Sequence, residues 1–269
     1  MYEEPYKWVE AVGNRRHYLD EQLKKGSPVV AVAYESGILL MTVSHGTPKV
    51  YEVYDRLALG GMGHPTDLEK LRFSLLEMAH VEGFNRSPFD VTGGRMVKYG
   101  IAPVIKQAFE EVFKAPFIVK ILLAELGHKV GKDSFLTINY DGTFEEKSHY
   151  AVLAATPSVE QEMVTYLRQE PTVSLEQAIG AAIRAWAVGD RAQCQVLEEA
   201  EAPREGRADP RQQPTNDEAL YAHMRQRVAE KTIECAVLDR SLQGSSKYRA
   251  LDDGELSRLL PTGMSNPLI

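Results

Sequence analysis

Two neighbouring apolar segments near the start of the chain restrict its fold more than any other feature. They cover residues 29–34 and 38–43 and flank the short turn Glu35-Ser36-Gly37. Two such runs joined by a glycine-containing turn are typical of an antiparallel hairpin. A strand with one exposed face alternates apolar and polar residues, whereas these segments are apolar along most of their length. The hairpin therefore predicts a sheet that is covered on both faces.

Strands and helices then follow in blocks. The pattern predicts two further strands, a helix pair, three strands, a second helix pair, a polar helix, a last strand and a closing helix. Strand clusters separated by helix pairs fit two stacked sheets between two helical layers, because apolar sheet faces and helix stripes must be covered. The predicted fold class is therefore α+β, a four-layer αββα sandwich. The predicted strands are 49–54, 57–59, 117–125, 135–140, 148–155 and 233–239, and the predicted helices begin at Pro65, Thr92, Pro157, Ser174, Asn216 and Asp252.

A helix over residues 3–25 precedes every strand. Trp8, Val12, Leu19 and Leu23 recur at helical spacing, and Gly26 ends the pattern. The apolar stripe of such a helix needs a surface that covers it. We expect that surface to be the rest of the same domain or a neighbouring copy of the chain.

Charge and composition exclude several classes of function. The formal net charge is −7, which disfavours a general binder of nucleic acid or of anionic membranes. No apolar run reaches the length of about 18 residues that a membrane span needs. The two cysteines, Cys194 and Cys235, have no metal or redox spacing, and we interpret them as reduced thiols of a cytoplasmic protein.

The sequence predicts neither a metal nor another cofactor. The seven histidines show no zinc-type spacing. Gly60-Gly61-Met62-Gly63 lies between a strand and a helix, as a phosphate-binding loop does. However, Thr66 stands where the dinucleotide fingerprint has its third glycine, and no Gly-Lys-Ser/Thr sequence is present.

The order of the predicted helices and strands, taken together with their residues, resembles the proteasome subunit family, and most closely the bacterial, actinobacterial-type α subunit. The similarity runs from about residue 9 to residue 196 and resumes over 233–260. No single segment is diagnostic, but their order and spacing together are. The segments are Gly26-Ser27-Pro28-Val29-Val30-Ala31-Val32-Ala33-Tyr34, Glu52-Val53-Tyr54-Asp55-Arg56, Asp90-Val91-Thr92-Gly93, Ala124-Glu125, Tyr140-Asp141-Gly142, Ser174-Leu175 and Cys235-Ala236-Val237-Leu238-Asp239.

The resemblance implies one proteasome-type domain over residues 1–269, with the αββα fold of the Ntn hydrolases. Residues 3–25 would be the helix that α subunits have and β subunits lack. A charged, proline-bearing segment at 198–216 would be a disordered loop insertion, and 261–269 a flexible tail. The implied role is the non-catalytic α subunit of a bacterial 20S proteasome core in the cytoplasm. Its partners would be further copies in a heptameric ring, a proteasome β subunit, and a ring-shaped ATPase activator that docks through its C-terminal tail.

The same resemblance raises the question of catalysis. The β relatives use an N-terminal threonine whose own amine is the base. Aligning the first hairpin places Ser27 at the nucleophile position, Lys49 at the lysine position and Val43 near the acid position. Freeing the amine of Ser27 requires cleavage after Gly26, which would discard the helix over 3–25. We therefore expect Ser27 to be a cryptic nucleophile position at most, and the chain to have no catalytic residue.

Two alternatives stay open at this point. One is a self-processing N-terminal-nucleophile hydrolase that uses Ser27. The other is a proteasome-like scaffold or assembly chaperone without a β partner.

In α subunits the lysine that matches Lys49 lines a pocket between neighbouring subunits and pairs with the C-terminal carboxylate of an activator. A lysine suits this task because it carries a mobile point charge with three donors. The same alignment places Gly26 and His64 at other walls of the pocket. The alternative for Lys49 is a solvated lysine at the end of a strand.

Overall fold

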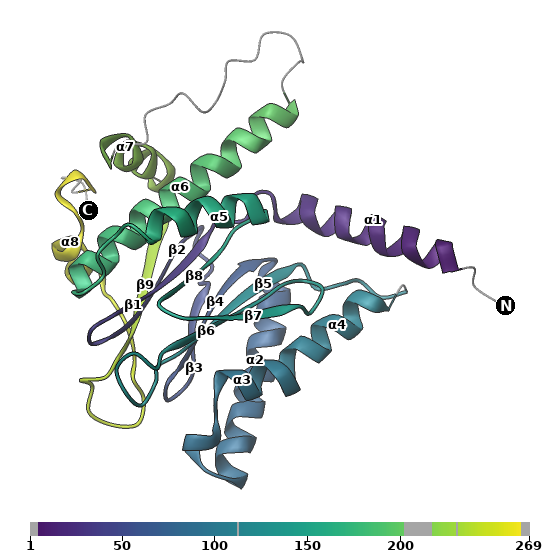
Figure 1. Cartoon of the computed structure of the whole chain (residues 1–269), viewed down its shortest axis with the longest axis horizontal. Helices are drawn as coiled ribbons and strands as arrows, with labels where there is room; N and C mark the ends of the chain where they lie inside the picture. Colours follow the sequence, from purple (N-terminus) through teal and green to yellow (C-terminus); the bar gives the residue numbers. More distant parts are fainter. Residues whose placement is uncertain (1–4, 112, 202–216, 230, 265–269) are drawn as a thin grey trace.

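Two antiparallel five-stranded sheets form the centre of the molecule. The computed structural model describes residues 5–111, 113–201, 217–229 and 231–264 (Figure 1). The first sheet has the order β10-β9-β2-β1-β8 and the second the order β3-β4-β5-β6-β7. The strands of the first sheet are β1 (Val29–Tyr34), β2 (Gly37–Ser44), β8 (Tyr150–Leu153), β9 (Thr232–Asp239) and β10 (Tyr248–Ala250). Those of the second are β3 (Val50–Tyr54), β4 (Leu57–Gly63), β5 (Val119–Glu125), β6 (Ser134–Ile138) and β7 (Phe144–Lys147).

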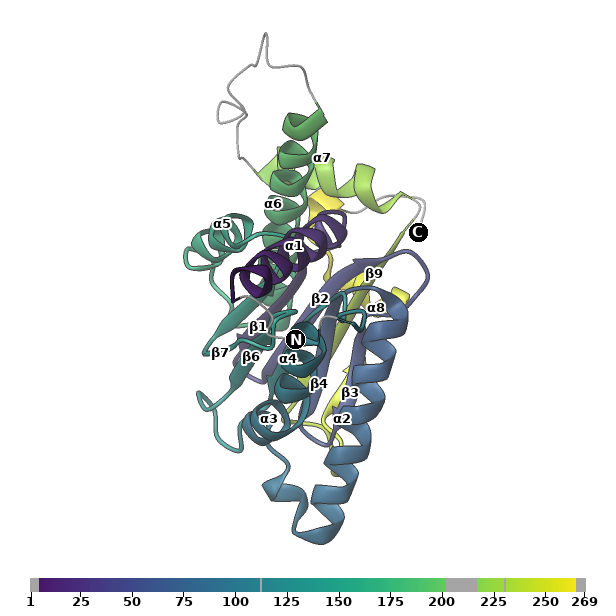
Figure 2. The same cartoon turned by 90° about the vertical axis from the view of Figure 1, so that its right-hand side faces the viewer.

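Helices cover the outer face of each sheet (Figures 1 and 2). The second sheet is covered by α2 (Pro65–Asn85), α3 (Gly93–Arg95), the π-helical segment Met96–Ile101 and α4 (Ala102–Glu110). The first is covered by α5 (Pro157–Leu167), α6 (Leu175–Glu201), α7 (Asp217–Val228) and α8 (Asp253–Leu259). Two short 3₁₀ turns lie at Pro88–Asp90 and Thr262–Met264.

Three separate apolar clusters hold these layers together. One lies between each sheet and its helices, and the third lies between the two sheets. Every residue of β2 is buried, because one face of the strand meets the helices and the other meets the second sheet. The α+β class and the four-layer αββα sandwich predicted from the sequence are therefore confirmed.

Helix α1 (Pro5–Leu23) is docked by its C-terminal half and extends away from the sandwich at its N-terminal half (Figure 1). Leu19 and Leu23 have no exposed surface and belong to the cluster between the sheets. Trp8 and Val9 are 41% and 69% exposed. The domain itself thus covers Leu19 and Leu23 completely and Val12 in part, and it leaves Trp8 largely uncovered.

Local sequence signals explain several boundaries. Ser174 and Gln177 form the predicted capping box: the Gln177 N–H donates to Ser174 Oγ at 3.2 Å, and the Ser174 N–H donates to Gln177 Oε1 at 3.2 Å. The break predicted at Pro103 takes the form of the π-helical turn Met96–Ile101. Beyond that turn Pro103 lies in the first turn of α4, where no backbone donor is needed.

Several predicted boundaries differ from the structure, and among the strand ends the largest change is that β4 runs to Gly63 where 57–59 was predicted. Helix α6 runs to Glu201, so residues 198–201 of the expected loop 198–216 are helical, and 202–216 lie outside the described residues. In the expected tail 261–269, Thr262–Met264 forms a 3₁₀ turn, and 265–269 lie outside the described residues. Strand β7 was not predicted, because its sequence Phe-Glu-Glu-Lys resembles a polar turn.

Candidate functional site

The three residues predicted for a docking pocket, Gly26, Lys49 and His64, each lie beside one of the last residues of strand β4 or directly after it. The carbonyl of Lys49 accepts a hydrogen bond from the Gly61 N–H at 2.9 Å. Gly26 lies against the next residue, Met62, since a Cβ on Gly26 would stand 2.7 Å from Met62 Cγ. His64 follows β4 directly and precedes α2. The register of the sheet thus gathers residues that are far apart in sequence.

Of these three residues, Lys49 carries the group that can bind an anion, its side-chain ammonium. The side chain is half-buried, and within the described parts of the chain its ammonium makes no hydrogen bond or ion pair. Burial lowers the pKa of Lys49, while the Glu234 carboxylate raises it and Lys231 lowers it further. A partly desolvated cation without a partner is suited to bind an anion.

Gly26 and His64 contribute in different ways. A Cβ at Gly26 would stand 2.7 Å from Met62 Cγ and 3.0 Å from the Leu23 carbonyl oxygen, so any larger residue here would force the Met62 side chain to shift. The side chain of His64 is exposed and makes no capping bond to α2. It is placed near Lys49 by chain connectivity alone, and its role stays a prediction.

Glu234 on β9 is a functional candidate that the sequence interpretation missed. Its Oε2 accepts the N–H groups of Lys49 at 2.8 Å and Val50 at 3.1 Å, so one side chain of the first sheet fixes the start of β3 in the second. Its Oε1 is buried and has no hydrogen-bond partner among the residues that the structure describes. The sequence did contain a signal for this residue. Glu234 is a charged residue on the same face of β9 as Ala236 and Leu238, and that face lines the space between the sheets.

A cavity of about 300 Å³ opens beside this link. Its walls come from the loop before β3, from the start of β9, and from β10 with the loop that follows it. The lining residues include Pro48, Val50, Thr232, Glu234 and Tyr248. Pro48 and Val50, the chain neighbours of Lys49, line this hollow, whereas Lys49 itself is not one of the lining residues.

Ser27 belongs to a hydrogen-bond network that connects the start of β1 to α6 and β2. Its Oγ accepts a hydrogen bond from the indole Nε1 of Trp186 at 3.1 Å and lies 3.5 Å from Thr42 Oγ1. Thr42 in turn donates to the Pro28 carbonyl at 2.7 Å. Val43, near the acid position, is 1% exposed within the apolar core. Within the described residues no base contacts Ser27 Oγ, and the Ser27 nitrogen is a peptide nitrogen.

Replacing Ser27 by alanine is expected to leave the chain uncleaved and to cost only modest stability. The indole N–H of Trp186 would lose its acceptor, which costs about 1–2 kcal/mol. Intact-mass spectrometry of the parent chain should find no species that begins at Ser27. A parent species starting there, absent from the Ser27→Ala variant, would establish the self-processing hydrolase instead.

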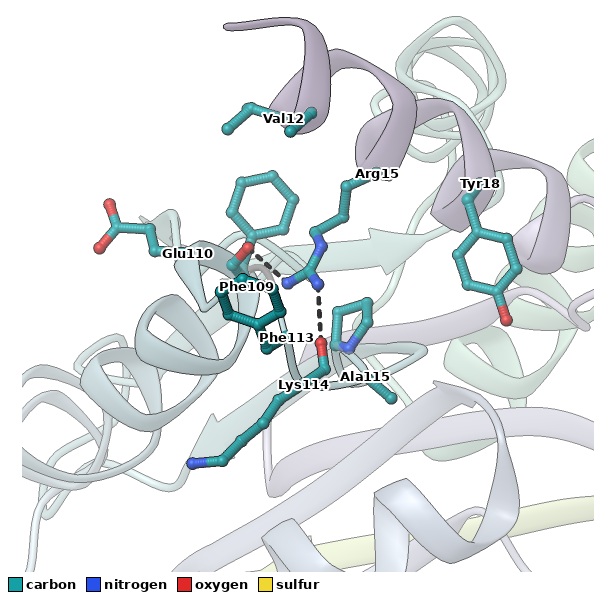
Figure 3. Close-up of a pocket in the computed structure, with 10 residues that line it drawn as sticks. Val12, Arg15, Tyr18, Phe109, Glu110, Phe113, Lys114 and Ala115 are labelled. Carbon is teal, nitrogen blue, oxygen red and sulfur yellow. Dashed lines mark hydrogen bonds between the residues drawn. The ribbon is translucent and has the colours of Figure 1, made fainter. Parts of the chain in front are cut away.

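A second hollow, of about 520 Å³, separates α1 from the end of α4 (Figure 3). Arg15 of α1 reaches across it to four carbonyls at the helix end and in the segment after it. Its Nη1 donates to the oxygens of Ala108, Phe109 and Glu111 at 2.9, 2.9 and 3.1 Å, and its Nη2 to that of Lys114 at 2.7 Å. The last carbonyls of a helix lack internal partners, and a cation there also meets the favourable end of the helix dipole.

Other kinds of site find little support. In the described ranges no three His, Cys, Asp or Glu side chains are grouped to hold a metal ion. Burial raises the pKa of the Cys235 thiol to about 12 and also raises that of Cys194, so neither thiol is activated as a nucleophile. No helix among the described residues is both long and apolar enough to cross a bilayer.

Comparison with known proteins gives a consistent result, although no family model matches the chain. The chain is 29% identical over 180 residues to the proteasome subunit alpha of Actinosynnema mirum, covering 65% of this chain and 66% of the relative. It is 31% identical over 171 residues to that of Saccharopolyspora erythraea, covering 62% and 65%. It is 25% identical over 251 residues to that of a Nocardioides species, covering 92% and 84%.

The matched regions span just under two thirds of the first two relatives and most of the third. The architecture agrees with these similarities, since two stacked five-stranded sheets lie between helical layers and a further helix precedes β1. The chain is therefore a homologue of the proteasome α subunits of actinobacteria, and its four-layer sandwich is the proteasome fold.

Proposed function

We propose that the chain is the non-catalytic α subunit of a bacterial 20S proteasome core. In this role it forms the outer ring of a threonine-type endopeptidase complex, gates the entry of substrates and docks an activator. The complex degrades intracellular proteins in the cytoplasm, which fits the two free thiols Cys194 and Cys235.

The observation that carries this proposal is the way the junction between α1 and β1 is built. Leu19 and Leu23 anchor α1 between the sheets, and Gln193 Nε2 holds the Gly26 carbonyl at 2.8 Å. Ser27 is bonded to Trp186 immediately after that point. Cleavage at this junction would release the anchored helix, so the junction favours a subunit that keeps its helix over a hydrolase that removes it.

The projecting half of α1 supports the ring-forming role. Trp8, Val9 and the adjacent groove leave apolar surface that the domain itself does not cover. A surface patch that meets a different patch on the next copy builds a closed ring when the rotation between copies closes. The proposed partners are further copies in a heptameric ring, a proteasome β subunit stacked on that ring, and a ring-shaped ATPase.

Lys49, Gly26 and His64 form the proposed activator-binding pocket. The unpaired ammonium of Lys49 takes the C-terminal carboxylate of the activator tail, since a charge-assisted bond to a carboxylate satisfies both groups. Gly26 keeps α1 close to β4 at one wall, and His64 directly follows the last residue of β4, Gly63.

Co-expression with the proteasome β subunit of the same genome tests the proposal. Size-exclusion chromatography and negative-stain imaging should find a four-ring barrel, and peptide hydrolysis should depend on the β threonine alone. Substitution of that threonine by alanine should abolish hydrolysis, while Ser27→Ala in this chain should leave the rate unchanged.

The alternatives give different results in the same experiment. A chain that hydrolyses peptides without a β subunit would be a self-processing enzyme. A chain that stays separate from the β subunit would be a scaffold or an assembly factor of another kind.

A further inference from the structure

The hollow between α1 and α4 leaves an apolar wall open to water (Figure 3). The guanidinium of Arg15 crosses the hollow, and it is bonded to carbonyl oxygens at the end of α4 and in the segment after it. Much of the remaining lining is aliphatic or aromatic, and Phe113 is 94% exposed. The apolar lining residues are Ala11, Val12, Phe109, Phe113, Ala115 and Pro116. An exposed apolar surface in a hollow is typical of a place where another molecule binds.

The same chain carries an exposed apolar tip that cannot fill its own hollow. We define the α1 tip as residues 7–10, all of which are exposed, with Trp8 and Val9 at its centre. Trp8 precedes Val12 by about one helical turn, which is about 6 Å along the axis of α1. Val12 lines the hollow and Trp8 does not, so the α1 tip lies beyond the edge of the hollow. Because α1 is one continuous helix, a tip that enters the hollow must come from another molecule.

The charges of the α1 tip are complementary to those of the hollow. The tip has one base, Lys7, and one acid, Glu10, on either side of its apolar centre. The lining of the hollow includes one exposed acid, Glu110, and one exposed base, Lys114. Each of these two is now paired with an exposed residue of opposite sign three or four positions away. Exposed pairs of this kind contribute little to stability and can be exchanged for contacts with a second copy, whose tip offers an opposite charge to each.

We propose that the α1 tip of one copy enters the hollow between α1 and α4 of the next copy, where Trp8 packs against Phe113. This inference rests on the proposed ring of copies, and it names the contact that joins one copy to the next. The two surfaces are different patches of the chain, so the contact is heterologous. An open row of copies leaves one tip and one hollow unfilled, whereas a closed ring fills all of them.

A disulfide between the two surfaces tests the contact directly, because it forms only where two Cβ atoms come within about 4.5 Å of each other. The variant Val9→Cys/Phe113→Cys is assembled with the proteasome β subunit, oxidised mildly and run on a denaturing gel without reductant. It should give a ladder of cross-linked chains that ends at the complete ring. Val9→Cys alone and Phe113→Cys alone should run as monomers. The matched pair Val9→Cys/Val130→Cys, whose second position is 68% exposed, should also run as a monomer.

Tryptophan fluorescence gives a second readout in the chain without added cysteines. The chain has two tryptophans, and Trp186 has no exposed surface, so quenching by acrylamide reports on Trp8. The quenching constant should fall severalfold between the single subunit and the ring, because the core of an interface excludes water. Phe113→Asp supplies the single subunit. An acid on the apolar wall should prevent ring formation, while the melting temperature should equal that of the parent because the side chain is exposed.

The contrary outcomes separate this contact from the proposed function. If barrels form but Val9→Cys/Phe113→Cys cross-links no more than the single variants do, the contact between tip and hollow is wrong and the α-subunit role stands. A ladder that stops at two chains would also overturn the contact, since it would indicate a symmetric pair. If the parent chain forms no particle with the β subunit, the proposed function itself is wrong.

Discussion

Replacing Lys49 by alanine is expected to abolish stimulation by the activator while ring and barrel assembly continue. The ammonium group has no partner among the described residues, so its removal breaks no bond within the chain. The backbone of Lys49 stays in place, because Glu234 Oε2 and the Gly61 N–H bind its N–H and its carbonyl. A carboxylate that entered the pocket would then lose its charged partner, which costs about 2–5 kcal/mol in a buried setting.

The measurement is activator-dependent degradation of an unfolded protein, read beside hydrolysis of a small peptide by the same barrel. A loss of about 30-fold or more in activator binding is expected from that free energy. Small-peptide hydrolysis should be unaffected, because it needs only the β threonines. Lys129→Ala is the matched control, as an exposed lysine in the loop between β5 and β6. Full stimulation with Lys49→Ala would remove the pocket from the proposed function.

The double variant Leu19→Ala/Leu23→Ala is expected to release α1 and prevent the ring from forming. Both side chains have no exposed surface and fill the space between the sheets. Each truncation of a buried leucine to alanine costs about 2–5 kcal/mol, partly through the cavity that it leaves. The sum approaches the whole stability of a typical domain, so the docked half of α1 is the first element that should detach.

Chemical denaturation and analytical sizing measure the two effects separately. The single variants should lower the unfolding free energy by about 2–5 kcal/mol and weaken the ring. The double variant should elute as a monomer or unfold at room temperature. Val130→Ala, at a side chain that is 68% exposed, should change stability by less than about 0.5 kcal/mol. A double variant that still forms rings with parental stability would show that α1 is not held by these two leucines.

Much of the fold followed from local patterns because those patterns report burial directly. The hairpin 29–34/38–43 was predicted from its unbroken apolar run, and the structure buries nearly all of it. The capping box at Ser174 was predicted from two side chains that interact within one turn. By contrast β7 has three charged residues out of four, and it exists because β6 offers it a partner edge. No local signal carries that information.

The candidate site was less predictable, for a related reason. Gly26, Lys49 and His64 could be named from the resemblance, but their proximity depends on the pairing of β4 with β3 and on the contact of Gly26 with Met62. Glu234 approaches Lys49 through β9, which pairs with β2 across nearly two hundred residues of sequence. A spacing rule along the chain cannot detect a contact that the sheet topology creates.

The guanidinium of Arg15 couples the movement of α1 to that of the end of α4. It holds three carbonyl oxygens at the end of α4 and a fourth at Lys114, all from a single residue of α1. If α1 tilts, residues 113–116 must therefore move with it, or the carbonyl groups at the end of α4 lose their hydrogen bonds to Arg15. A movement of the far tip of α1 would therefore be transmitted to the segment that follows α4, where Phe113 lines the hollow and is 94% exposed.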